Sequence, residues 1–319
     1  MIGDSIAAWE GENQARDSMV GMDLASLHQE LVASPDLLIV QDLDGVCIPL
    51  VKDPLTRRLS AGYVHAAARL RGSFVVLTNG EHEGHRGVNR LVEKALGDSE
   101  KARSQGLYLP GLAAGGVQLQ DEFGNVTHPG VSEAEICFLA SVPGRMKALM
   151  CSMLPALMPE LSDQELSVEV DLAVLDTQLS PTINLNHLFS RIPDDVEHQR
   201  RLQSMLESLM QQLMAMAVSE GLHDSFFLHV APNLGRDPLG CERLKPAVKG
   251  DVGSTDIQFM LRGAIKEAGL LVLINRHIAA RTGTAPLGEA FNVRTAPNDH
   301  EALRALCKQR IPPEQMPHL

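Results

Sequence analysis

The chain alternates short, continuous apolar runs with stretches in which apolar residues recur every three or four positions. The runs at Leu37–Val40 and Phe74–Leu77 contain no polar residue, which is typical of strands buried on both faces of a parallel sheet. Between them, residues 58–71 have the apolar spacing of a helix. Strand, helix and strand in this order predict a βαβ unit and therefore an α/β fold.

The same patterns divide the rest of the chain. An apolar stripe at helical spacing from Leu202 to Ala217, closed by Gly221, predicts a long helix whose methionines belong to its core-facing side rather than to a promiscuous binding groove. Other elements are also predicted. They are helices at 24–32, 85–96, 257–277 and 299–310, a hairpin that turns at 122–125, and a strand at 225–232.

Composition excludes some classes of protein. The chain has 319 residues, a formal net charge of −12 and 3% aromatic residues, so it does not suit partners such as nucleic acid or an anionic membrane. Its five cysteines are scattered without a paired motif, which is typical of a reducing compartment. The first residues form no apolar leader, and no run approaches the roughly 20 apolar residues of a membrane span. We therefore expect a cytoplasmic protein.

Two carboxylates follow the first strand directly. Asp42 and Asp44 lie where parallel α/β sheets bind ligands, just past the carboxyl end of a strand. The two negative charges repel each other unless a cation lies between them, and Mg²⁺ binds well to carboxylate oxygens together with a substrate phosphate. Asp42 can then attack phosphorus in line, while Asp44 protonates the leaving alkoxide and later activates water. Gly45 allows the backbone to turn.

The second strand ends in a complementary group. In "VVLTNG", Thr78 offers a hydroxyl, and Asn79 and Gly80 offer backbone amides, to phosphoryl oxygens. "LIVQDLDGV" followed by "VVLTNG" resembles the first two motifs of the haloacid dehalogenase-like phosphatases. The resemblance implies a doubly wound parallel sheet as core, with an inserted α/β cap domain. It also implies that Asp42 is the nucleophile, Asp44 the acid and base, and Thr78 the phosphate-binding hydroxyl.

Longer stretches narrow the resemblance. "GLYLPGLAAGGVQ", "SPTINLN", "APNLGRD" and "DIQFMLRGAIKEAG" resemble the glucosylglycerol-phosphate phosphatases of salt tolerance from about residue 30 onward. That family implies Mg²⁺-dependent hydrolysis of 2-O-(α-glucosyl)glycerol 3-phosphate to the osmolyte glucosylglycerol and phosphate. We expect a loose lead-in at 1–22, a phosphatase core at 23–127 and 257–319, and a cap that sets substrate specificity at 128–256.

The resemblance also implies a lysine that neutralises the aspartyl-phosphate. Lys266 is our choice because it begins an apolar helix in "KEAGLLVLIN", as the lysine of capped relatives does, whereas Lys245 and Lys249 compete for the role. A fourth motif supplies further metal carboxylates. "GDVGSTD" matches its spacing and offers Asp251, but no buried strand precedes it. We therefore favour coincidence and expect the true fourth motif beyond Leu319.

Polar residues near the strand ends are candidates for substrate binding. Glu81, His82 and Arg86 follow Thr78 closely, so they can contact sugar hydroxyls or phosphate, with helix capping as the alternative. The spacing H-E-x-H from His82 differs from the zinc motif H-E-x-x-H and argues against zinc.

The predicted cap offers candidates of its own. Asn233, Arg236 and Asp237 can reach the glucosyl group or form an Asx turn.

Two other functions remain open at this stage. The catalytic residues do not choose the sugar, so a sucrose- or trehalose-phosphate phosphatase is one alternative. The other is a catalytically impaired homologue without the fourth motif, which binds glucosylglycerol phosphate or a glucosylglycerol-phosphate synthase as its partner.

Overall fold

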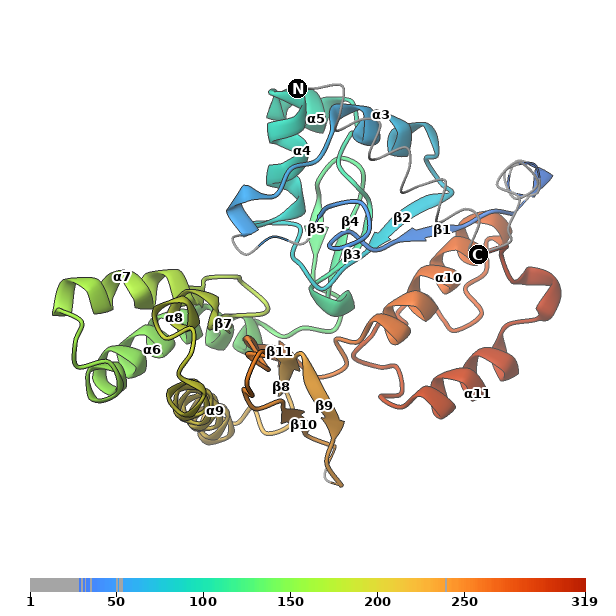
Figure 1. Ribbon diagram of the computed structural model, residues 1–319. Helices are drawn as coiled ribbons and strands as arrows, with labels where there is room; N and C mark the ends of the chain where they lie inside the picture. Colours follow the sequence, from blue (N-terminus) through green and yellow to red (C-terminus); the bar gives the residue numbers. More distant parts are fainter. Residues whose placement is uncertain are drawn as a thin grey trace.

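The computed structural model describes residues 36–49, 51, 54–238 and 240–319, together with residues 29, 31, 33 and 34. The predicted lead-in at 1–22 and most of the helix predicted at 24–32 lie outside the described residues. The described part forms a core lobe and a cap lobe (Figure 1).

The core is built on a five-stranded sheet in the order β1-β2-β3-β4-β5. Its first three strands are parallel, with Ile39 opposite Phe74 and Val76 opposite Gly111. The predicted βαβ unit is thus confirmed, and the predicted hairpin adds two antiparallel strands, so the sheet as a whole is mixed. The strands are β1 Ile39–Gln41, β2 Phe74–Leu77, β3 Gly111–Ala113, β4 Gln118–Gln120 and β5 Val126–Thr127.

Helices cover both faces of this sheet (Figure 1). Val76 packs among residues of α3, α4 and α5, whereas its neighbour Leu77 belongs to the cluster that contains α10. Successive side chains of a strand point to opposite faces, so the α/β core is doubly wound as predicted. The helices are α3 Ala61–Arg69, α4 Val88–Leu96, α5 Ser99–Ser104, α10 Lys266–Thr282 and α11 His300–Arg310, with short 3₁₀ turns η1 Pro54–Thr56, η2 Ala114–Gly116 and η3 Pro313–Gln315.

The cap contains its own antiparallel sheet in the order β6-β7-β11-β8. A second, two-stranded sheet of β9 and β10 continues beside β8. The strands β9 and β10 are not evident from the sequence, because their segment is rich in polar residues and glycine. The cap strands are β6 Val174–Leu175, β7 Thr182–Asn184, β8 Phe226–Ala231, β9 Asn233–Arg236, β10 Glu242–Leu244 and β11 Asp256–Leu261.

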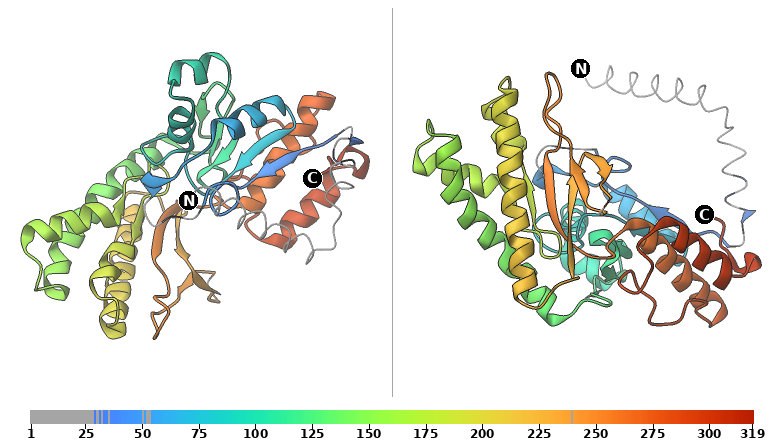
Figure 2. Two further views of the ribbon diagram at one scale, coloured as in Figure 1. Left: turned by 45° about the horizontal axis from the view of Figure 1, so that its top comes forward. Right: turned by 90° about the horizontal axis from the view of Figure 1, so that it is seen from below.

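Cap helices cover one face of the cap sheet, and both views of Figure 2 place the sheet between these helices and the C-terminal helices of the core. Phe138, Phe226 and Phe259 stack with ring centroids 4.9–5.9 Å apart. The predicted stripe of the long helix is buried from Leu202 to Ala217, which confirms that it is core. The helices are α6 Glu133–Leu157, α7 Asp163–Ala173, α8 Asn186–Arg191 and α9 Val196–Ser219.

None of the helices that the structure describes, even α6 and α9, combines the length and the apolar character needed to cross a bilayer.

The prediction of a helix over 257–277 was wrong in its first part. Residues 256–261 form β11, which lies between β7 and β8 in the cap sheet, and the helix α10 begins only at Lys266. Buried Ile257 and Phe259 alternate with the half-buried Asp256 and Gln258, which is the period of a strand, and the last three residues, 259–261, are all buried. The cap sheet therefore extends to Leu261, beyond the predicted boundary at 256.

The C-terminal segment runs beside the first core strand. Leu37 and His318 form a parallel bridge, in which the Leu38 amide donates to the His318 carbonyl at 2.9 Å. The His318 amide in turn donates to the carbonyl of Asp36 at 2.7 Å. This pairing places residues 316–319 at the edge of the sheet next to β1.

Candidate active site

The two aspartates emerge from a tight loop at the carboxyl end of β1. The amides of Cys47 and Ile48 both donate to the Leu43 carbonyl, and Gly45 adopts a positive φ of 80°. Glycine reaches this conformation without a steric penalty. Asp42 Oδ1 accepts from the Leu43 amide at 2.8 Å, which leaves Oδ2 for contacts with other elements. The turn thus presents both carboxylates at one end of the sheet.

Lys266 is the lysine that the structure brings to this pair. Its Nζ donates to Asp42 Oδ2 at 2.5 Å from the first residue of α10. Its competitor Lys245 lies in the cap and pairs with Asp251 at 2.6 Å. An ammonium next to the proposed nucleophile neutralises charge where an aspartyl-phosphate would form.

The approach of Lys266 depends on a close backbone contact. Gly115 has a φ of 65°, and a Cβ there would lie 2.6 Å from the carbonyl oxygen of Ala264. Only glycine permits this approach. Since Ala264 precedes Lys266 by two residues, the contact between η2 and the segment before α10 helps to place the ammonium at the strand ends.

Arg57 is a site residue that sequence analysis missed. Its Nη1 donates to both oxygens of Asp44, at 3.0 and 2.9 Å, and its side chain is only 9% exposed. Its other terminal nitrogen donates to the backbone carbonyl of Arg86. In "PLTRRL" nothing distinguishes Arg57 from Arg58, so only the tertiary contact of Arg57 with Asp44 reveals it.

The turn after β2 lies beside Asp44 and Arg57. Thr78 is buried, and its Oγ1 accepts from the Gly80 amide at 3.2 Å. A Cβ at Gly80 would lie 3.6 Å from Thr78 Oγ1, 3.8 Å from Asp44 Oδ2 and 3.9 Å from Arg57 Nη1. The ends of β1 and β2 therefore gather a hydroxyl, a carboxylate and a guanidinium around one glycine, as adjacent parallel strands should.

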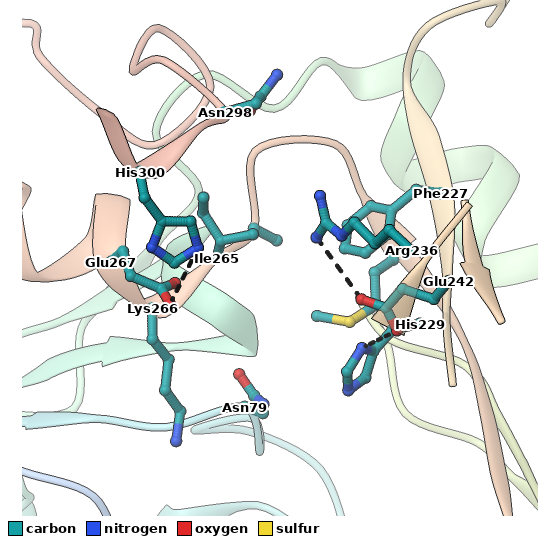
Figure 3. A pocket seen from close by; sticks show the side chains of 12 residues that line it. Asn79, Phe227, His229, Arg236, Glu242, Ile265, Lys266, Glu267, Asn298 and His300 are labelled. Carbon is teal, nitrogen blue, oxygen red and sulfur yellow. Dashed lines mark hydrogen bonds and ion pairs between the residues drawn. The ribbon is translucent and has the colours of Figure 1, made fainter. Parts of the chain in front are cut away.

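A cavity of about 260 Å³ opens between this end of the core and the cap. In Figure 3, Asn79, Lys266, Glu267 and His300 of the core face Phe227 and other cap residues across the cavity. The predicted contact residue Asn79 thus lies in its wall. A ligand bound at the strand ends would have the cap as its opposite wall.

The cap wall carries a charged cluster. Glu242 Oε2 accepts from His229 Nδ1 at 2.8 Å and from the Val230 amide at 2.9 Å, and Arg236 Nη2 lies 3.6 Å from Glu242 Oε1 (Figure 3). Burial opposes ionisation of Glu242, but hydrogen bonds from His229 and Val230 and the nearby positive charges lower its pKa overall.

Of the residues predicted in the cap, Arg236 lines the cavity but Asn233 does not. Asn233 holds a turn, since its Oδ1 accepts from the Gly235 amide at 2.9 Å and its Nδ2 donates to the Val230 carbonyl at 2.9 Å. Asp237 likewise accepts from the Cys241 amide within the β9–β10 turn. His229 and Glu242 were missed, because their strands had to be paired before their common face became visible.

The structure corrects the predicted sugar contacts of the segment after Thr78. Glu81 is 3% exposed, and its carboxylate accepts from three backbone amides and a hydroxyl of the cap. Burial raises its pKa, and the hydrogen bonds from Leu179, Gln178 and Ser180 oppose this. Arg86 pairs with Asp176 of the cap. Both residues join the lobes instead of lining the cavity.

His82 is fully buried and also lies away from the cavity. Its Nε2 is 3.2 Å from the carbonyl oxygen of Gly111, and its backbone amide donates to Gln118 at 2.6 Å. Burial lowers the pKa of His82 to about 4, so the ring is neutral at physiological pH and supports the fold.

Asp251 does not join the aspartate pair. It lies between β10 and β11, where Lys245 and the Gly253 amide neutralise its carboxylate and lower its pKa. Throughout the described ranges, no three His, Cys, Asp or Glu side chains gather into a group that could hold a metal ion. That the match of "GDVGSTD" to a metal motif is a coincidence of spacing stays a prediction.

Comparison with known proteins decides the family. The family model described as glucosylglycerol-phosphate phosphatase matches residues 36–319. The chain belongs to this family. The glucosylglycerol-phosphate phosphatase of Synechocystis sp. is 49% identical over 296 residues, which cover 93% of this chain and 70% of that protein. Membership of this phosphatase family suggests that the chain uses a divalent metal cofactor.

Two solved structures also match the chain. The C-terminal domain of trehalose-6-phosphate phosphatase from C. albicans is 12% identical with a TM-score of 0.42, over 90% of this chain and 96% of that chain. A haloacid dehalogenase-like hydrolase from B. subtilis is 12% identical with a TM-score of 0.30, over 79% of this chain and 80% of that chain.

In a member of the glucosylglycerol-phosphate phosphatase family, the arrangement of charged residues around the strand ends and the cavity indicates which chemistry each part can support. A carboxylate with an adjacent ammonium, a second carboxylate with a guanidinium, and a buried hydroxyl gather at the strand ends, and the ammonium of this group, Lys266, also lines one end of the cavity. The polar cluster of the cap stands at the other end. Phosphoryl chemistry fits the first end, and recognition of hydroxyl groups fits the second.

Proposed function

We propose that this chain hydrolyses glucosylglycerol 3-phosphate to glucosylglycerol and phosphate through an aspartyl-phosphate on Asp42. The observation that carries the proposal is the pairing of Asp42 with Lys266, which lines a cavity whose far wall is the cap. Family membership supports the choice of substrate.

The reaction takes two steps on the residues present. An oxygen of Asp42 forms a bond to phosphorus as the bond from phosphorus to the glycerol oxygen breaks, and Asp44 gives its proton to the leaving alkoxide. Water then attacks the phosphorus of the aspartyl-phosphate, Asp44 takes the water's proton, and the Asp42 carboxylate is released with phosphate. Lys266 and the hydroxyl of Thr78 hold the negative oxygens during both steps.

The donor set fits Mg²⁺ as the cofactor. Asp42 and Asp44 offer hard carboxylate oxygens at one end of the sheet, and proteins commonly hold Mg²⁺ through one or two carboxylates together with substrate phosphate oxygens. The ion, held by Asp42 and Asp44, would supply charge neutralisation between the carboxylates and the phosphate. In the structure, Lys266 and Arg57 compensate the two carboxylates.

The cap cluster supports recognition of a glycosylated substrate. His229, Arg236 and Glu242 line the cavity opposite Lys266 and offer both donors and an acceptor to hydroxyl groups. Phe227 in the same wall offers an apolar ring. A phosphate held at the strand ends would therefore direct its sugar toward these residues, so we propose that they select the glucosyl group.

The test is phosphate release by the purified chain. Glucosylglycerol 3-phosphate, sucrose 6-phosphate, trehalose 6-phosphate and p-nitrophenyl phosphate are compared, each with Mg²⁺ or with excess EDTA. We expect the highest kcat/KM with glucosylglycerol 3-phosphate and its loss in EDTA. Asp42→Asn should abolish release, whereas Asp171→Asn, an exposed aspartate of the cap, serves as the matched control and should retain it.

Two results would overturn the proposal. A higher kcat/KM with sucrose or trehalose phosphate would assign another sugar phosphate. Tight binding of glucosylglycerol phosphate by the wild type without turnover would identify a binding homologue, for which a glucosylglycerol-phosphate synthase is the partner to test. We place the reaction in the cytoplasm, as the composition suggests.

A further inference from the structure

One carboxylate of the core is wholly engaged by the cap. Glu81 Oε2 accepts from the Gln178 amide at 2.8 Å, and Oε1 accepts from the amides of Leu179 and Ser180 at 2.6 and 3.0 Å and from Ser180 Oγ at 3.1 Å. Three successive amides directed at one buried carboxylate make strong, charge-assisted hydrogen bonds. The β6–β7 loop of the cap is therefore tied to this single side chain.

The same side chain belongs to the phosphate-binding turn. Glu81 directly follows Gly80, whose amide donates to Thr78 Oγ1 and whose carbonyl accepts from the Ala114 amide at 2.7 Å. The Glu81 carbonyl accepts from the Val88 amide at 2.8 Å. The backbone of Glu81 is thus held by the core, while its carboxylate is held by the cap.

A second link lies beside the first. Arg86 pairs with Asp176 at the start of the same cap loop, and the backbone carbonyl of Arg86 accepts from Arg57. Arg57 in turn donates to both oxygens of Asp44. We name Glu81, Arg86 and residues 176–180 the core–cap clasp. It connects a cap loop to Thr78 through Gly80 and to Asp44 through Arg57.

The clasp and the cavity involve opposite edges of the cap sheet. The sheet order is β6-β7-β11-β8, so the loop between β6 and β7 lies at one edge, while the cavity is lined from β8, β9, β10 and β11 toward the other. The clasp residues are absent from the cavity wall. Their effect on the reaction must therefore pass through the core residues that they hold.

We infer that Glu81 is a positioning residue, which uses the docked cap loop to hold the phosphate-binding turn at 78–80 in its reactive geometry. This inference rests on the proposed phosphatase activity but not on the identity of the sugar. Small displacements of positioned groups lower rates strongly. Loss of the clasp should therefore slow turnover even of a phosphate ester too small to reach the cap cluster.

The test compares Glu81→Gln with Glu169→Gln in the full chain. Glu169 is equally buried at 3% exposure, but it pairs with Arg191 inside the cap. We expect Glu81→Gln to lower kcat about tenfold with both glucosylglycerol 3-phosphate and p-nitrophenyl phosphate. Hydrogen exchange at the amides of 178–180 should also become faster. Glu169→Gln should leave kcat with both substrates unchanged, whatever its Tm.

The outcomes separate a positioning role from a structural one. A lower Tm and faster exchange in Glu81→Gln with unchanged kcat on the folded protein would overturn the inference, as would a kcat loss confined to the sugar phosphate. Should Glu81→Gln fail to fold, Asp176→Asn breaks the second link and is expected to lower kcat in the same way. A wild type active only on p-nitrophenyl phosphate would refute the proposed sugar phosphate and leave this test intact.

Discussion

Lys266 Nζ lies 2.5 Å from Asp42 Oδ2, although 224 positions separate the two residues in the sequence. In the proposed mechanism, an ammonium in this place would stabilise the negative charge that builds up during transfer of the phosphoryl group to Asp42.

We therefore expect Lys266→Ala to lower kcat by about 100-fold or more, because it removes a charge aimed at the reacting group. Steady-state phosphate release measures this. Lys147→Ala, which removes an exposed lysine paired with Asp171, is the matched control and should keep wild-type kcat. Retention of activity in Lys266→Ala would show that another cation serves Asp42.

The contact of Arg57 Nη1 with both oxygens of Asp44 leads to a second prediction. We expect Arg57→Ala to lower kcat about tenfold or more, because Asp44 loses the group that orients its carboxylate. Arg57→Lys should restore little, since Arg57 holds Asp44 and the Arg86 carbonyl with two different nitrogens and an ammonium has only one. The adjacent Arg58→Ala is the control. Equal rates in Arg57→Ala and wild type would exclude a role in the reaction.

Gly115 provides a test of the backbone contact behind Lys266. An alanine there would meet the Ala264 carbonyl at 2.6 Å and would also be strained by its φ of 65°. Gly72→Ala is the matched control, because its φ of 88° is also positive but no atom lies within 4 Å. We expect the free energy of unfolding to fall by about 1 kcal/mol in Gly72→Ala, and by about 3 kcal/mol or more in Gly115→Ala.

Urea denaturation measures both losses, and kcat is measured on the folded protein. A comparable loss in the two variants would mean that the backbone relaxes around the new Cβ. Only Gly115→Ala should also lower kcat, because the displaced segment carries Lys266.

The cap cluster predicts a change in KM that depends on the substrate. Arg236→Ala should raise KM for glucosylglycerol 3-phosphate about tenfold, since the sugar loses a hydrogen-bond donor and Glu242 loses its neighbouring charge. KM for p-nitrophenyl phosphate should stay within about twofold, because this ester carries no sugar hydroxyls. Arg243→Ala, on the paired strand β10, is the control. Equal changes with both substrates would argue against sugar recognition by Arg236.

His82 predicts acid sensitivity of the fold. Burial lowers its pKa from 6.5 to about 4, so the unfolded chain binds a proton at a higher pH than the folded chain does. Stability is therefore fully present above pH 6.5 and is lost as the pH falls toward 4, by about 3 kcal/mol.

Chemical denaturation at pH 7.5, 6, 5 and 4 measures this loss. His82→Gln should be less stable at pH 7.5 but should show a smaller change with pH. A slope with pH that is the same in both proteins would assign the acid sensitivity to other groups.

Much of the core was predictable because its determinants are local. The continuous apolar run at Phe74–Leu77 keeps its side chains away from water only if the strand is buried on both faces. This strand was predicted at its true bounds. The placement of Asp42, Asp44 and Thr78 followed, since the ends of adjacent parallel strands must meet at one edge of a sheet. The long cap helix was equally clear from its stripe.

The errors came where one pattern allows two structures. "IQFML" was assigned to the helix that follows it, because a short apolar run does not by itself distinguish a strand from a helix. Its partners, β7 and β8, lie far away in the sequence. The polar segment that holds β9 and β10 gave no apolar signal at all.

The sequence by itself determined that two aspartates and a threonine lie at neighbouring strand ends. Apolar periodicity and the order of adjacent strands depend on residues that are close together in the chain. Only the tertiary structure decided which cation faces each carboxylate, Lys266 for Asp42 and Arg57 for Asp44. It also decided that Glu81 is held by the cap, whereas His229 and Glu242 face the cavity. These relationships depend on packing between segments far apart in the chain, and a charged side chain looks the same in sequence wherever its partner lies.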